Sequence, residues 1–200
     1  SHSNSFYGQR SSFASAVDFM PSDPPRLLWF EMPYCKHLTA DSREKMFKFI
    51  EVLDCHTEQV APEDFLYDFL EAHRIIHHYE IAKNLSDIKK NFPDTLSEQF
   101  TRALAYGAAI DDLLYEKALV RRSEAISYFQ RSFDEFDVII TPAAQGEAPL
   151  FSDSNTGNPV FSTVWTLCGL PCITMPVLVS ENKMPVGIQL VGKMGEDQKL

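Results

Sequence analysis

Apolar side chains recur at helical spacing along much of the chain. The longest run lies between Ile110 and Phe136 and steps alternately by four and three residues, through Tyr115, Leu119, Arg122, Ile126, Phe129, Phe133 and Phe136. This spacing predicts a long amphipathic helix with one face on a core. A coiled coil shows the same spacing, but the run is short for one and Arg122 interrupts it.

Three further stretches predict helices. The first begins near Asp41, which stands at capping-box spacing from Glu44, and continues with apolar residues at Met46, Phe49, Ile50 and Leu53. The second opens at Pro62, because proline fits the first helical turn. Its predicted core stripe is Phe65, Leu66, Phe69, Leu70, His73, Ile76 and His77. The third spans 95–107, with Phe100, Leu104 and Tyr106 facing inward.

Four short apolar runs predict strands, at 26–30, 137–141, 172–179 and 186–191. We expect the last two to be buried, with a short helix and the break Gly169–Pro171 before them. The stretch 143–159 is rich in Gly, Pro and polar residues and predicts a long loop, and 196–200 predicts one turn of a helix. Strands that alternate with helices favour an α/β fold with helices covering a largely buried sheet.

The chain divides into two parts by composition. Residues 1–24 are rich in serine and end in prolines, which predicts an irregular lead-in. Residues 25–200 carry all the predicted elements and are interpreted as part of one domain, truncated at both ends. The serine runs near the N-terminus lack a nearby lysine and are interpreted as flexible chain.

Charge and cysteine content exclude several function classes. The formal net charge of −10 repels phosphate backbones and anionic lipids, so we expect no nucleic-acid or membrane partner. No apolar run is long enough to span a bilayer, and no signal peptide is visible. The four cysteines match no zinc spacing and are interpreted as reduced thiols of a cytoplasmic protein.

One side-chain set has the chemistry of a metal site. His73 and His77 lie one helical turn apart, and Glu80 follows them on the same face. Histidine and carboxylate groups suit zinc. All three also continue an apolar stripe, where a hydrogen-bonded core histidine is more common, so we expect no metal. His78 is expected to face away, into solvent.

Four segments resemble the amidase signature family, in the family's order. They are Ala72–Ala82 (AHRIIHHYEIA), Phe136–Pro142 (FDVIITP), Gly169–Pro176 (GLPCITMP) and Pro185–Gly192 (PVGIQLVG). Many members of that family have Asn where this chain has Thr166, which concerns the subgroup. The resemblance implies a mixed α/β/α sandwich and hydrolysis of a carboxamide without a cofactor.

The resemblance also implies what the chain lacks. The family's Ser-Ser-Lys triad and its Gly/Ser-rich nucleophile segment match no residues here, so no catalytic residue is assigned. The family's substrate-pocket wall, which follows the Asp-to-Pro strand and opens the next helix, matches Thr141, Ala144, Gln145, Thr156, Gly157, Asn158, Pro159 and Thr163.

The sequence therefore predicts the C-terminal part of an amidase, acting on a small-molecule amide. The resemblance implies that its N-terminal half supplies the catalytic residues, and a homodimer is a further possible assembly. The alternative is a non-catalytic α/β module that binds a small ligand. A His/Glu metal enzyme is a weaker alternative.

Overall fold

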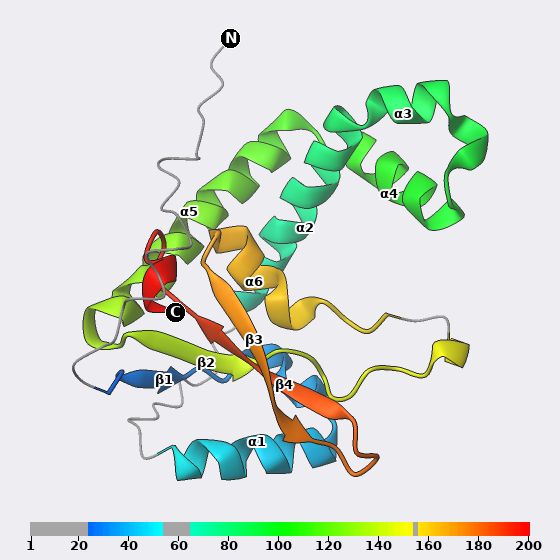
Figure 1. The fold of residues 1–200 in the computed structure, drawn as a ribbon. Coiled ribbons are helices and arrows are strands. Elements are labelled where there is room, and N and C mark those ends of the chain that lie inside the picture. The colour runs from blue at the N-terminus through cyan, green and yellow to red at the C-terminus, as the bar shows by residue number, and fades with distance from the viewer. Residues whose placement is uncertain (1–23, 54–64, 154–155) are drawn as a thin grey trace.

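A mixed four-stranded sheet forms the centre of the computed structural model, which describes residues 24–53, 65–153 and 156–200 (Figure 1). The strand order is β1-β2-β4-β3. β1 (Leu27–Trp29) runs parallel to β2 (Val138–Pro142), while β4 (Pro185–Val191) is antiparallel to both β2 and β3 (Cys172–Val179). The four predicted strands are therefore confirmed, within a residue or two at their ends.

Helices cover both faces of this sheet. α1 (Ala40–Val52) packs on one face, where Met46 and Ile50 meet Trp29, Ile140 and Ile188. The opposite face carries α2 (Phe65–Asn84), α5 (Asp112–Glu135) and α6 (Val160–Cys168). Successive strand residues point to opposite faces, so Ile139 enters one core and Ile140 the other. The predicted helix–sheet–helix layering is confirmed.

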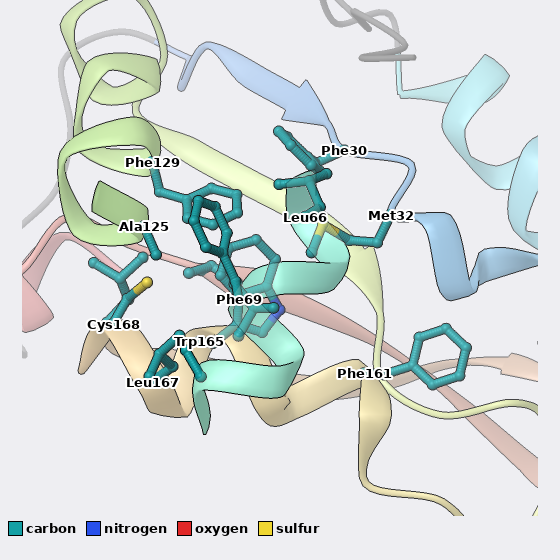
Figure 2. Packing of buried hydrophobic residues seen from close by; sticks show 14 of the residues in the cluster. Phe30, Met32, Leu66, Phe69, Ala125, Phe129, Phe161, Trp165, Leu167 and Cys168 are labelled. Carbon is teal, nitrogen blue, oxygen red and sulfur yellow. The ribbon is translucent and has the colours of Figure 1, made fainter. Parts of the chain in front are cut away.

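Aromatic rings fill the larger core, between the sheet and α2, α5 and α6 (Figure 2). The ring of Phe129 lies 4.9 Å from that of Trp165 and 5.3 Å from that of Phe30, measured between centroids. Arg122, which interrupts the apolar stripe, donates from Nε to the carbonyl oxygen of Leu167 at 2.9 Å. This cation lies at the C-terminal end of α6, where the helix dipole favours it.

A small helical unit extends the α2 end of the molecule. α3 (Ser86–Asn91) was not predicted, while α4 (Glu98–Ala108) matches the predicted helix at 95–107. α4 packs closely on α2, because Gly107 faces the carbonyl group of His78, where a Cβ atom would lie 1.9 Å from its oxygen. Tyr106, expected to face inward, is exposed instead and packs its ring against His78.

Several local predictions were wrong for identifiable reasons. The N-cap of α1 is Thr39, whose hydroxyl accepts from the Ser42 amide at 3.3 Å, so Asp41 lies inside the helix and pairs with Lys45. On α2, His77 is exposed, because Ala72, Ile75 and Ile76 carry the core face. The C-terminal turn is a 3-10 helix at Asp197–Lys199.

The largest correction concerns β3, which was expected to be buried. It is exposed along most of its length, because it is the last strand of the sheet and only β4 pairs with it. The predicted lead-in at 1–24, except Pro24 itself, and the helix start at Pro62 lie outside the described residues.

Replacing Phe129 by alanine should strongly destabilise the fold. Phe129 is 0% exposed, and its ring touches three elements. Removing a buried ring of this kind costs about 3–5 kcal/mol. Leu113→Ala, on the same helix but 60% exposed, is the control and should change the free energy of unfolding by less than about 0.5 kcal/mol. Urea unfolding measures both, and equal losses would contradict this account of the core.

Candidate functional site

The first arm of the expected pocket wall leaves β2 at a buried polar residue. Thr141 is 0% exposed and pairs with Gln189 of β4. Its hydroxyl oxygen has no hydrogen-bond partner in the described part of the chain. After it, the Ala143 amide donates to the Gly187 carbonyl at 3.2 Å, which extends the pairing by one residue. Ala144 is exposed and Gln145 half-buried.

Hydrogen bonds fix this arm to two other elements. The carbonyl oxygen of Gln145 accepts from the Thr39 amide at 2.9 Å, next to the start of α1. The Glu147 carboxylate accepts from the Ser180 hydroxyl and, at 2.7 Å, from the Asn182 amide, both in the turn between β3 and β4. These bonds, that from Ser180 first, lower the pKa of Glu147. The first arm is thus held in place.

The second arm enters α6 and is exposed from Thr156 to Pro159. Gly157 has a φ of 91°, a left-handed conformation that favours glycine. The Asn158 side chain accepts from the Val160 amide at 3.0 Å and caps the first turn of α6. One turn later the half-buried Thr163 donates its hydroxyl to the Pro159 carbonyl at 3.1 Å.

The two arms extend from the sheet and from α6 toward the same end of the molecule, on either side of the short helix Phe151–Asp153 (Figure 1). Thr141, Ala144 and Gln145 lie on one arm, and Thr156, Gly157, Asn158, Pro159 and Thr163 on the other. A shared substrate contact between the two arms stays a prediction.

A cleft of about 430 Å³ lies beside α6. Its walls include Ser162, Trp165 and Thr166 of α6, Cys172 of β3, Gln189 of β4, and Asp197. Sequence reasoning missed Trp165 and Gln189. The signal for Gln189 was available: it is the one strongly polar residue inside the apolar strand PVGIQLV, at a position that alternation places inward.

The described cysteines are not activated nucleophiles. Burial raises the pKa of Cys172 to about 11 and those of Cys35 and Cys168 to about 12. All three are free thiols. A thiol with a raised pKa stays protonated near neutral pH and reacts slowly, so thiolate catalysis does not fit these positions.

The histidines of α2 do not form a metal site with Glu80. The rings of His73 and His77 stack with centroids 5.5 Å apart, whereas Glu80 accepts a hydrogen bond from the Tyr115 hydroxyl at 2.9 Å. No group of three metal-ligating side chains occurs among the described residues. His78, expected in solvent, is half-buried and donates from Nδ1 to the Arg74 carbonyl at 2.8 Å.

The comparison with protein families covers most of the chain. The family profile described as Amidase matches residues 35–200, a range that contains β2, α6, β3, β4 and both arms of the expected pocket wall. The chain belongs to the amidase signature family. The resemblance seen in the four sequence segments is thereby confirmed.

Similar curated proteins are longer than this chain. A subunit of the glutamyl-tRNA(Gln) amidotransferase from Chlamydia felis is 22% identical over 219 residues, which cover 93% of this chain and 44% of that protein. The corresponding protein from Alkaliphilus metalliredigens is 30% identical over 96 residues, covering 44% of this chain and 19% of that protein. The chain thus spans less than half the length of these amidase relatives.

Solved structures share the fold. A crystal structure of an amidase superposes with a TM-score of 0.78 at 22% identity, covering 90% of this chain and 44% of that one. The 6-aminohexanoate cyclic dimer hydrolase superposes with a TM-score of 0.67 at 15% identity, covering 96% and 46%. Among the described residues, no helix combines the length and apolar character needed to cross a membrane.

Stability should fall with pH through the protonation of His73. Burial, and then the charges of His77 and His78, lower the pKa of His73 below its ordinary 6.5. The unfolded chain therefore binds this proton first. The stabilising contribution is complete above the unfolded pKa and is lost as pH falls through the lower folded pKa. Urea unfolding from about pH 8 to pH 5 measures this slope.

His73→Gln should flatten that part of the profile, because glutamine does not titrate. The matched control is His37→Gln, which changes an exposed histidine on a different element and should leave the slope unaltered. An unchanged slope in His73→Gln would assign the acid sensitivity to other groups.

Proposed function

We propose that this chain is the C-terminal part of an amidase that hydrolyses a carboxamide C–N bond. The observation that carries the proposal is the family match over residues 35–200. Ser-Ser-Lys chemistry would come from an N-terminal half, which has no counterpart among the residues described. The chain covers 44% of the Chlamydia felis relative, which supports a second half of similar size.

The exposed edge of the sheet supports a polypeptide partner at β3. Ile173, Val177 and Val179 present apolar side chains on this strand, and Val179 is 57% exposed. The outer edge of β3 pairs with no described strand. Unpaired apolar edges associate readily with another strand. We assign this edge to the N-terminal half of the same enzyme, and a homodimer is the second possible assembly.

In this enzyme, the chain would form one wall of the acyl pocket. Thr141, Ala144 and Gln145 would line one side, fixed by the hydrogen bonds of Gln145 and Glu147. Thr156, Gly157, Asn158, Pro159 and Thr163 would line the other. The catalytic half would supply the serine nucleophile and the backbone amides that stabilise the oxyanion. The reaction needs no cofactor.

The free thiols support a reducing compartment such as the cytoplasm. The non-catalytic binding module gains no support from the relatives compared above, whose printed names are those of an amidase, an amide hydrolase and part of an amidotransferase.

This chain alone should hydrolyse no amide, and adding the N-terminal half should restore hydrolysis. The physical reason is that no activated nucleophile lies among the described residues, since the cysteine thiols have raised pKa values. The measurement is ammonia release from acetamide and benzamide, with each half alone and both halves together. Turnover by the isolated chain that disappears on mutating one of its residues would refute the proposal.

Thr163→Phe in the complete enzyme should impair bulky acyl amides selectively. Overfilling a packed wall costs about 1–3 kcal/mol, or roughly tenfold to a hundredfold in kcat/KM. Acetamide should be largely spared, because it leaves that volume empty. The control is Thr163→Ser, which keeps the hydroxyl bonded to Pro159 without adding bulk. Equal losses on all substrates would make Thr163 a folding residue.

A further inference from the structure

Unpartnered polar atoms gather on one side of the sheet. Thr141 of β2 and Gln189 of β4 are direct neighbours in the strand register and are 0% and 5% exposed. The hydroxyl oxygen of Thr141 and Oε1 of Gln189 have no hydrogen-bond partner in the described part of the chain. Trp165, in the helix over this face, is 1% exposed, and its Nε1 also lacks a partner among the described residues.

Buried polar groups in native proteins are nearly always hydrogen-bonded, and each exception calls for an explanation. Leucine or methionine would fill the position of Gln189 without an unpaired amide. A glutamine here therefore weakens the fold unless another molecule completes its hydrogen bonds. Catalytic and binding sites are where such costs are usually met.

The cleft beside α6 gives a molecule access to this region. Gln189 and Trp165 both contribute to its walls, with the hydroxyl-bearing Ser162 and Thr166 one turn apart on α6. Its volume of about 430 Å³ lies within the usual range for small-ligand pockets. The register puts Thr174 of the exposed strand β3 on the other side of Gln189.

We propose that the cleft between α6 and β4 binds the amide group of a small neutral ligand, and that Gln189 is the side chain that recognises it. The inference rests on the proposed function for its ligand class, since an amidase takes amides. It adds a site outside the two arms of the pocket wall and a residue that the family resemblance did not assign.

The chemistry of the lining favours an amide over an acid. A carboxamide has an N–H donor and a carbonyl acceptor, as Gln189 itself has, so two amides can satisfy each other in a pair. A carboxylate offers acceptors only and could not donate to Oε1 of Gln189. The one ionisable carboxyl in the lining, that of Asp197, would repel an anion and tolerate a neutral ligand.

The test is binding of propionamide to the full-length protein, with propionate as the comparison. Calorimetry, read before appreciable turnover, gives the affinity, and thermal unfolding gives the stability. We expect propionamide to bind and to raise Tm, and propionate to do neither at the same concentration. Gln189→Met should bind propionamide at least tenfold more weakly, yet unfold at a higher Tm without ligand, because its buried side chain needs no partner.

The matched control is Gln198→Met, which changes an exposed glutamine near Asp197 and should leave affinity and Tm unchanged. Unchanged affinity in Gln189→Met, or equal binding of propionate, would overturn the proposal. If Gln189→Met fails to fold, the side-chain amide resonances of the unaltered protein decide. Those of Gln189 should shift with propionamide while those of Gln198 stay in place, and a Gln189 signal that does not move contradicts the site.

Parallel ammonia release separates this inference from the proposed function. Hydrolysis with full affinity in Gln189→Met would keep the amidase and reject the cleft. Propionamide binding through Gln189 without any hydrolysis would keep the cleft and reject the amidase. A peptide group of a neighbouring polypeptide has the same chemistry. If it fills the cleft, propionamide will not bind the full-length protein, and the proposal fails.

Discussion

The packing of Trp165 against Phe129 and Phe30 is the contact on which the rest of the structure depends. These rings come from α6, α5 and the segment after β1, which are far apart in sequence and lie within 6.4 Å of one another by ring centroids. Aromatic pairs at such distances are stabilised by edge-to-face geometry as well as by burial. α6 is short, and this contact, with the Arg122 bond to Leu167, fixes its position over the sheet.

Fixing α6 also determines the functional geometry. The helix has two working sides: Pro159 and Thr163 continue the loop that follows β2, whereas Ser162, Trp165 and Thr166 border the cleft above Gln189. The β2 arm is held separately, by Gln145 at the start of α1 and by Glu147 at the β3–β4 turn. Two rigid supports therefore carry one pocket wall, which is the arrangement that a preorganised site requires.

Much of the fold follows from the sequence because its apolar spacing is unambiguous. The alternating step through Phe129 and Phe133 specified α5, and the short apolar runs specified all four strands. Burial of β3 was mispredicted, because an apolar strand reads the same whether its neighbour is present or absent. The cap at Thr39 was missed because two acceptors stood close together. Pairing of Thr141 with Gln189 depends on strand order, which spacing along one chain does not encode.

The exposed strand and the unpartnered amide have the same physical origin. Among the described residues, β3 is apolar without a neighbour on its outer edge, and Gln189, one strand further in, is polar without a hydrogen-bond partner for Oε1. An edge strand is completed by backbone hydrogen bonds and apolar contact, which any strand of suitable sequence can supply. A single buried amide is completed only by a group with matching donor and acceptor. The strand edge therefore specifies an assembly partner, whereas Gln189 specifies a chemical group, and the two need different occupants.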